Sequence, residues 1–445
     1  MTADPGHWAA LRDRVDGSLM LPTDDGFDAA RRRPYVAGHG EPVPAALVRC
    51  ASTPDVVAAI RFAREHGLPL AVRSGGHCSA GRSSTTGLLV DVSMMDSVEV
   101  AENRVRVGAG VRLAGLVAAL AAHGRALPTG TCPTVGVAGL TLGGGWGILG
   151  RRYGLTCDHL TRAEVVTADG DVLVVDDERE PDLFWALRGG GTAGLAMVTS
   201  MVFRTVPAPR MTSFRCRWPA AAASAVTNAW LAWAVDAPDR MCAELGVSAD
   251  AVTLHGAMAA NGAETAALVD RFRRDLPPAR TDTVELSYLE TARYHAERLG
   301  ELDPAVHLYS TSEFFERDLP GDTVDALLAR FATGPAVREI GFMPWGGAYG
   351  AVPAADTAFA HRRARYLIHH IACTDEASDP ADAWVRDMRD VVHGYGTGGV
   401  FANFADAGLD DPERAYYGDN AGRLRDVKGR YDPGNLFGPA VAAGP

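Results

Sequence analysis

One glycine-dense run, residues 128–147, constrains the fold of this chain more than any other stretch. It reads PTGTCPTVGVAGLTLGGGWG. Glycines let backbone N–H groups approach a large anionic ligand without side chains in the way. The run matches neither the Gly-x-Gly-x-x-Gly pattern nor a Walker loop. It does hold Cys132 between a threonine and a proline, so it predicts a ligand-binding loop with a nucleophile at its edge.

A second stretch, 73–78, gives this cysteine its meaning, because it reads Arg-Ser-Gly-Gly-His-Cys. A strand, a helix and a second strand are predicted directly before it. That order puts the glycine turn at the carboxyl end of a strand, where open α/β sheets bind ligands. A lone histidine after glycines is usually a turn residue with a satisfied hydrogen bond. Together with Cys132, however, His77 becomes a candidate ligand-site residue.

The two stretches together resemble the berberine-bridge-enzyme-like branch of the vanillyl-alcohol-oxidase flavoproteins. The resemblance runs from about residue 8 to residue 437. It implies one FAD attached twice, with His77 bonded to the flavin 8α-methyl and Cys132 to flavin C6. Attack on C6 needs a thiolate, which clustered backbone N–H groups favour. The alternative for Cys132 is a small buried hydrophobe, the commonest state of a free cysteine.

The resemblance also implies an α+β fold, in which a two-lobed FAD-binding domain of the PCMH type accompanies a substrate domain with an antiparallel sheet flanked by helices. The length of 445 residues suits two domains. A boundary is predicted at the proline-containing segment that follows Val206. We therefore expect an FAD-binding domain over 1–206, a substrate-binding domain over 207–399 and a segment over 400–445 that returns to the FAD domain.

Local patterns predict several elements of the first domain. Residues 8–20 suggest a helix, and Thr53 before a proline suggests the N-cap of another. An Asp-Gly pair at 169–170 predicts a hairpin, because this pair favours the tight turn between antiparallel strands.

The motif match assigns further residues to FAD. Those assigned to its pyrophosphate, its ribityl chain and the surrounding loops are Arg73, Ser74, Gly75, Gly76, Val137, Gly139, Gly143, Gly144 and Gly145. Tyr417 and Asn420 match a tail motif that lies near the flavin ring in the family. Gly194 and Leu195 depart from the family pattern, which has Asn and Phe there, so cofactor contacts at that point are left open.

Two positions bear on the reaction. Val135 matches a position at which a small aliphatic side chain leaves room for O2 near the reactive flavin carbon, which favours an oxidase; its alternative is an ordinary core residue. The family's usual base is a tyrosine in an Asn-Tyr pair, and here the pair is Asn403-Phe404. Phe401 also stands where tyrosine is common. Another base must then act, or the reaction differs.

The candidates for that base lie on a predicted strand and are Tyr366, His369 and His370. Successive residues of a strand face opposite sides, so at most one of the two histidines points at the flavin. A histidine near its unperturbed pKa suits proton abstraction at neutral pH. The alternative, that both histidines are structural or exposed, carries equal weight.

Composition excludes several classes of function. The net charge of −12 argues against nucleic acid or an anionic membrane as a partner. Seven cysteines without a C-x-x-C spacing form neither a disulfide framework nor a metal site. The start has no signal-peptide pattern, and no stretch of eighteen apolar residues occurs, so a cytoplasmic protein is expected.

The sequence thus predicts an FAD-dependent oxidase that transfers a hydride from a substrate carbon to flavin N5, with O2 regenerating the flavin and giving H2O2. The expected substrate is a sugar, or an alcohol or amine carbon of a small natural product, and tailoring of secondary metabolites is favoured. A redox-neutral cyclase or isomerase is the competing hypothesis, because Phe404 replaces the usual base. A non-catalytic flavin-binding protein is a third. The identity of the substrate, its stereochemistry and the oligomeric state stay open.

Overall fold

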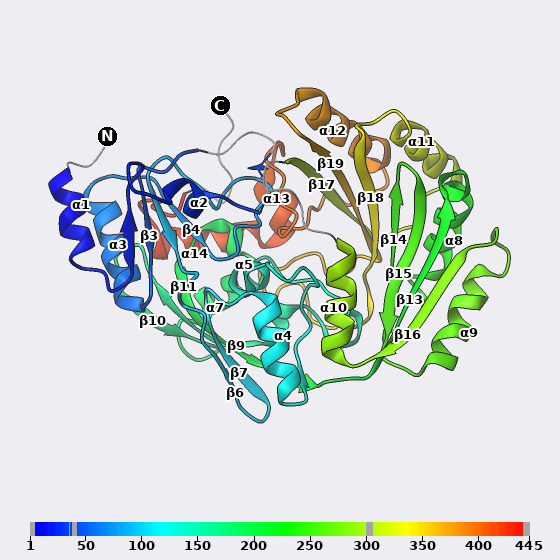
Figure 1. Cartoon of the computed structure of the whole chain (residues 1–445), viewed down its shortest axis with the longest axis horizontal. Helices are drawn as coiled ribbons and strands as arrows, with labels where there is room; N and C mark the ends of the chain where they lie inside the picture. The colour runs from blue at the N-terminus through cyan, green and yellow to red at the C-terminus, as the bar shows by residue number, and fades with distance from the viewer. Residues whose placement is uncertain (1–4, 35, 38–41, 300–305, 439–445) are drawn as a thin grey trace.

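The computed structural model describes residues 5–34, 36–37, 42–299 and 306–438. In Figure 1 the chain forms two halves, with the N-terminal elements and the last helices in one and the middle of the sequence in the other. Helices and sheets are both abundant, which confirms the predicted α+β class. None of the described helices is long and apolar enough to cross a membrane.

A small, mainly parallel sheet begins the first half. Its strand order is β1-β3-β5-β4, where β3 and β4 both run parallel to β5 and β1 is antiparallel to β3. The bounds are β1 Ser18–Met20, β3 Ala46–Arg49, β4 Leu70–Arg73 and β5 Leu88–Asp91. The prediction of a helix over 8–20 is wrong beyond its first part, because helix α1 (Pro5–Arg12) ends early and β1 follows.

Helix α3 (Thr53–Glu65) connects β3 to β4. Its N-cap is Ser52, whose side chain accepts a hydrogen bond from the Asp55 backbone N–H, so the predicted cap is displaced by one residue. The Thr53 hydroxyl instead donates to Glu164 at 2.7 Å. Strand β4 then leads directly into the glycine turn that holds His77, as the sequence predicts.

The second sheet of this half is antiparallel, with the order β10-β9-β11-β7-β6. The predicted hairpin is confirmed, since β9 pairs with β10 and Gly170 at the turn has a φ of 80°. The bounds are β6 Val98–Val100, β7 Arg104–Gly108, β9 Leu160–Val166, β10 Val172–Val175 and β11 Met197–Arg204. Both sheets of this half contribute to one hydrophobic core, and a smaller cluster against the first sheet contains Phe27, Leu47, Ala71 and Leu89.

The second half is built on an eight-stranded sheet with the order β16-β13-β15-β14-β18-β19-β17-β2. All neighbours pair antiparallel except β2, which runs parallel to β17. The bounds are β2 Val36–Ala37, β13 Met211–Pro219, β14 Met241–Ser248, β15 Ala251–Met258, β16 Arg280–Leu286, β17 His307–Phe315, β18 Val337–Pro344 and β19 Tyr366–Thr374.

Four helices cover the outer face of this sheet, and the sheet and helices together enclose a second hydrophobic core (Figure 1). They are α8 Ala223–Trp233, α9 Gly262–Arg273, α11 Gly321–Phe331 and α12 Asp379–His393. A fifth helix, α10 (Tyr288–Leu299), lies between the halves, where the Tyr288 hydroxyl donates to the Leu127 carbonyl at 3.2 Å. The inner face of the sheet is thereby turned toward the first half.

The remaining elements complete the first half and the connections. The helices are α2 Phe27–Arg31, α4 Leu113–Ala122, α5 Val137–Leu142, α6 Gly150–Tyr153, α7 Pro181–Leu187, α13 Pro412–Tyr417 and α14 Ala421–Tyr431. Short 3-10 turns are η1 Thr156–His159, η2 Gly191–Ala193, η3 Ala220–Ala222, η4 Gly347–Gly350 and η5 Gly418–Asn420, and β8 (Arg125–Ala126) pairs with β12 (Val206–Pro207).

An aromatic cluster joins the two halves. Phe314, Trp345, Phe359 and Phe401 pack within 4.9–6.1 Å of one another, mostly edge to face. They share a core with Trp146 of the glycine-dense run. The second half therefore contacts the first directly behind the predicted cofactor loop.

A buried ion pair crosses the same boundary. The Arg362 guanidinium donates to both carboxylate oxygens of Asp158, at 2.9 and 2.7 Å, and to the Thr357 hydroxyl at 2.7 Å. The two charged side chains are only 2% and 8% exposed. We expect Arg362→Met to lower the free energy of unfolding by about 3–5 kcal/mol, because Asp158 is left buried without its counter-ion.

Urea denaturation measures this effect, and the neighbouring residue supplies the control. Arg363 pairs with Glu316 at 3.2 Å, but its side chain is 84% exposed. Arg363→Met should change the free energy of unfolding by no more than about 1 kcal/mol. Equal effects of the two substitutions would contradict a stabilising role for the buried pair.

Candidate flavin site

The two predicted loops lie against each other in the structure. A Cβ on Gly75 would stand 2.3 Å from the backbone nitrogen of Gly136, and a Cβ on Gly136 would stand 2.2 Å from the Ser74 hydroxyl. Only glycine allows this approach. The Ser74 hydroxyl donates to the Ala109 carbonyl at 2.6 Å, which fixes the first loop.

His77 and Cys132 meet at one hydroxyl group. Thr134 Oγ1 lies 2.9 Å from His77 Nε2 and 3.6 Å from Cys132 Sγ. Both side chains are partly exposed. Burial, and then the positive charge of Arg112, lower the pKa of His77 to about 4, so its imidazole is neutral near pH 7. A neutral nitrogen nucleophile and a sulfur nucleophile therefore lie side by side.

The glycine turn at the end of the run is held from the far end of the chain. Gly144 and Gly145 have φ angles of 115° and 84°, which other residues rarely adopt. The Asn403 side chain accepts from the Gly145 N–H at 3.0 Å and donates to the carbonyls of Gly139 and Leu140 at 3.3 and 3.1 Å. A Cβ on Gly143 would stand 2.3 Å from the Asn403 amide nitrogen. Asn403 thus clamps the turn.

The other predicted residues of the two loops divide by their surroundings. Val137 is fully buried in the core of the first half, and Val135 is partly buried against it. Gly139 is exposed, with open space where a Cβ would project. Gly76 has a φ of 76°. The backbone at Gly139 is therefore open to a ligand, whereas the Val137 side chain anchors this segment in the core.

Three residues predicted to bind the cofactor contact other parts of the protein. The Arg73 guanidinium donates to main-chain carbonyls, including those of Arg31 at 2.8 Å and Ser83 at 3.0 Å. The Asn420 amide donates to the Ala354 and Thr357 carbonyls at 2.7 and 3.1 Å. Tyr417 is buried in the core of the first half. These contacts fix the three side chains within the protein, and their assignment to FAD stays a prediction.

The two residues that depart from the family pattern, Gly194 and Leu195, also have defined places in the fold. Gly194 has a φ of 62°, and its carbonyl accepts a hydrogen bond from Lys428 at 2.8 Å. Leu195 is buried in the core. The Gly194 carbonyl therefore links the first half to Lys428 of helix α14, and Leu195 adds to the core.

Strand β19 separates the candidate bases by its alternation, as the sequence predicts. His369 lies on the inner face, where its Nε2 is 2.6 Å from the Ser310 hydroxyl. Its ring stacks parallel on Phe404, with 3.9 Å between centroids. Burial lowers the pKa of His369 to about 3, so its ring is neutral at pH 7 but is a weaker base than the expected histidine with an unperturbed pKa. Because Phe404 directly follows Asn403, His369 stands next to the clamped glycine turn.

The other two candidates lie on the outer face of β19. His370 is fully buried, and neither ring nitrogen has a hydrogen-bond partner among the described residues. Tyr366 stacks on Phe315, and its hydroxyl donates to the Arg317 carbonyl at 2.9 Å. The structure does not bring either of them to His77 and Cys132, since the sheet itself intervenes.

Three residues of this region had no functional prediction of their own. In the sequence, Thr134 is one residue of the motif, and Asn403 is the neighbour of Phe404. Ser310 gave no signal at all. The contacts of Asn403 and Ser310 span 258 and 59 residues of sequence, which local patterns do not reveal.

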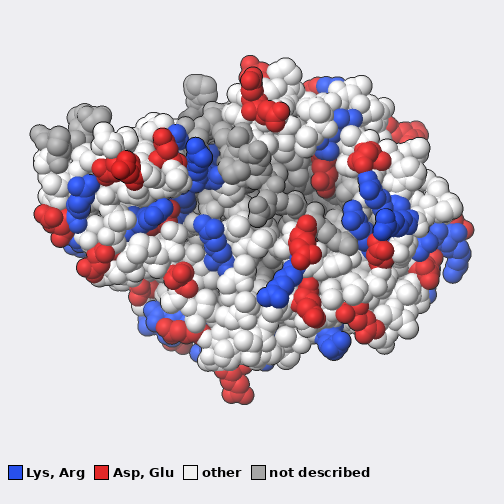
Figure 2. Space-filling model, viewed as in Figure 1, with Lys and Arg blue, Asp and Glu red and all other residues white. Residues whose placement is uncertain are grey.

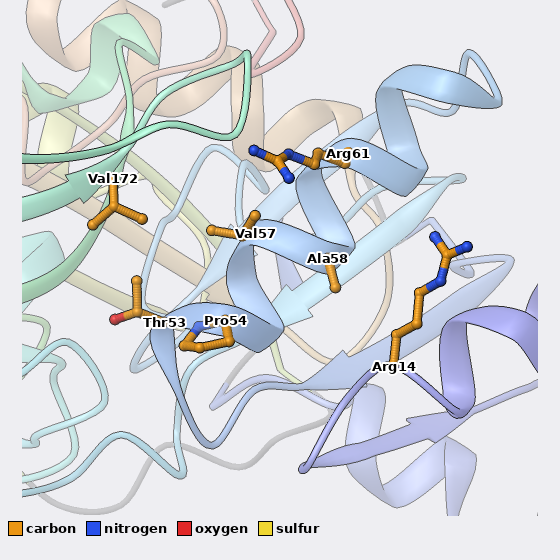
Figure 3. Close-up of a pocket in the computed structure, with 7 residues that line it drawn as sticks. All are labelled: Arg14, Thr53, Pro54, Val57, Ala58, Arg61 and Val172. Carbon is orange, nitrogen blue, oxygen red and sulfur yellow. The ribbon is translucent and has the colours of Figure 1, made fainter.

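One face of the molecule carries mixed charge. On the face shown in Figure 2, Lys and Arg are interspersed with Asp and Glu. A separate hollow of about 420 Å³ lies on helix α3 (Figure 3). Its lining consists of Arg14, Thr53, Pro54, Val57, Ala58, Arg61 and Val172. It contains none of the predicted site residues.

Comparisons with known proteins give the class. A family model described as an FAD binding domain matches residues 44–176, and one described as berberine and berberine like matches residues 400–440. Two stretches far apart in the sequence therefore match, and the structure packs them together through Asn403. The fold and the site define an FAD-linked oxidoreductase.

The similar proteins narrow this class. An uncharacterized FAD-linked oxidoreductase of Bacillus subtilis (strain 168), YvdP, is 30% identical over 95% of this chain and 97% of its own. The (R)-6-hydroxynicotine oxidase of Paenarthrobacter nicotinovorans is 38% identical over 44% of this chain and 43% of its own. The chain belongs to the berberine-bridge-enzyme-like family of FAD-linked oxidoreductases.

A solved structure shares the whole fold. Glucooligosaccharide oxidase from Acremonium strictum, described with a 6-S-cysteinyl, 8α-N1-histidyl FAD, superposes with a TM-score of 0.88. The match covers 98% of each chain at 24% identity. The likeness covers both halves of the chain and confirms the predicted fold. The match to the FAD binding domain identifies FAD as the cofactor.

Proposed function

We propose that this protein is an oxidase that carries FAD on two covalent bonds, one to His77 and one to Cys132. The observation that carries the proposal is their common contact with Thr134, at 2.9 and 3.6 Å. Nitrogen and sulfur are the two nucleophiles that a doubly attached flavin needs. The glucooligosaccharide oxidase described above has the same pair of attachments, which supports this assignment.

The loops around these residues fit a large planar group with a pyrophosphate tail. At Gly75 and Gly136 the two loops pack against each other, and at Gly139 the backbone faces open space. N–H groups of such loops bind anions well. We assign the residues of 1–206 and 400–445 to FAD binding and those of 207–399 to the substrate.

Bound FAD would accept a hydride from a substrate carbon and pass the electrons to O2, giving H2O2. The contribution of this chain is to hold the substrate against the inner face of the eight-stranded sheet and to remove a proton. His369 is the proposed base, because it lies on that face beside Phe404 and the clamped turn. Val135 is proposed to leave room for O2 above the second loop.

The substrate is proposed to be an alcohol, sugar or amine carbon of a small natural product. One similar protein is named for a cyclic amine and another for oligosaccharides, so both chemistries occur among the relatives. Secondary metabolism is the setting that we favour from the composition of the chain.

Anaerobic flavin bleaching tests this function. Purified protein is mixed without O2 with xylobiose, cellobiose and a set of cyclic amines and secondary alcohols, and flavin absorbance is followed. We expect one class to bleach the flavin, and admitted air to restore it with one H2O2 per product. Product mass should fall by two hydrogens.

A redox-neutral cyclase or isomerase is the second candidate, and the apolar Phe404 ring beside His369 is what favours it. Such an enzyme would convert its substrate without net bleaching and without peroxide. A product of unchanged mass, formed equally with and without O2, would replace the oxidase proposal by this one.

A further inference from the structure

The base proposed above has a polar partner on the neighbouring strand. Ser310 of β17 and His369 of β19 lie on the same face of the sheet, since Ser312 is the residue directly opposite His369. The Ser310 hydroxyl reaches diagonally to His369 Nε2 at 2.6 Å. This is the one hydrogen bond of the His369 ring among the described residues.

Two other neighbours fix the orientation of the ring. Phe404 covers one ring face in a parallel stack. On the other side of β19, Gly341 of β18 is paired with His369 and has no side chain. A Cβ at Gly341 would find nothing nearer than the Cβ and carbonyl oxygen of His369, at 3.8 and 3.9 Å. The ring is held by Ser310 and Phe404 and has space over Gly341.

The two ring nitrogens therefore differ. Nε2 contacts the Ser310 hydroxyl, whereas no hydrogen bond of Nδ1 occurs among the described residues. A neutral imidazole carries one proton, and its place is set by the hydrogen bond that the other nitrogen makes. An N–H without an acceptor is the rarer arrangement in proteins, so the proton belongs on Nε2, where Ser310 accepts it.

We propose that Ser310 is a positioning residue that holds His369 as the Nε2–H tautomer and leaves the Nδ1 lone pair toward the substrate. The proposal rests on the proposed function, in which His369 is the base. In the step it serves, the substrate O–H or N–H bond breaks and its proton forms an Nδ1–H bond. The electron pair stays on the substrate heteroatom and forms the double bond to carbon as the hydride leaves to the bound flavin, the oxidant.

The tautomer can be measured without any substrate. Holoenzyme labelled with ¹⁵N-histidine is examined by NMR, and the His369 signals are assigned by their loss in His369→Gln. We expect the wild type to show protonated Nε2 and unprotonated Nδ1 from pH 8 to pH 5. Ser310→Ala should shift both nitrogen signals toward a mixture of tautomers, and Ser310→Thr should restore the wild-type pattern because it keeps the hydroxyl.

A neighbouring serine supplies the control. The Ser312 hydroxyl lies on the same strand and face but accepts from the Phe401 N–H at 3.2 Å, so Ser312→Ala should leave the His369 signals unchanged. Protonated Nδ1 in the wild type, or identical His369 signals in Ser310→Ala, would overturn the proposal. If Ser310→Ala does not fold, Ser310→Cys provides the weakened hydrogen bond. The NMR result does not depend on flavin reduction by a substrate. The tautomer proposal can therefore be wrong while the bleaching experiment still supports the proposed oxidase.

Discussion

The double variant His77→Ala/Cys132→Ser will give a colourless pellet when it is precipitated with acid. Acid unfolds the chain and releases any flavin that is held only by noncovalent contacts. Wild-type protein will keep the colour, because either of two bonds survives unfolding. Each single variant will also keep it, through the remaining bond. Absorbance of the washed pellet, redissolved in denaturant, measures the bound flavin.

A nearby cysteine makes the control specific. Cys78 follows His77 directly and is also partly exposed. Cys78→Ser should retain all of the covalent flavin. A yellow pellet from the double variant, or a colourless one from Cys78→Ser, would show that the attachment points are wrongly assigned.

His369→Gln will lower kcat/KM by about 10²–10⁴, which is the usual contribution of a positioned general base. Its flavin content should stay normal, because His369 lies on β19 and not in the two loops that hold His77 and Cys132. His123→Gln is the matched control, since this exposed histidine contacts only the Ala119 carbonyl of its own helix. Steady-state rates with the compound that bleaches the flavin measure both variants.

The pH dependence follows from the same residue. Burial lowers the pKa of His369 to about 3, so the neutral, proton-accepting form is lost only as the pH falls through that value. Any acid limb due to His369 should therefore lie below pH 4. A limb near pH 6.5 that disappears in His369→Gln would show that the histidine is solvated in the working enzyme.

Much of this site could be predicted because its signals are local. The glycines around His77 and Cys132 stand in two short runs, and these runs together with the two nucleophiles carry the family resemblance that predicts the site. The hairpin at Gly170 followed from two adjacent residues. The helix predicted over 8–20 was too long, because Ser18–Met20 pairs with β3 and tertiary pairing overrides a weak local preference.

Other parts of the site depend on the folded sheet. The alternation of β19 separated His369 from His370, yet only the packing of helices on one face decides which of them is buried. Arg73 belongs to the motif, but the sequence does not reveal that its guanidinium donates to the Arg31 carbonyl of helix α2. Asn403 and Ser310 act on partners from distant segments, so no periodic pattern marks them.

The clamp by Asn403 has a consequence for how the protein matures. Its partner Gly145 is synthesised 258 residues earlier, so the turn lacks the hydrogen bonds of Asn403 until that later segment has been made. The binding loop of a nascent chain is consequently incomplete, whatever cofactor is present. Stable flavin loading is thus expected to depend on a segment that is synthesised long after the loop that it completes.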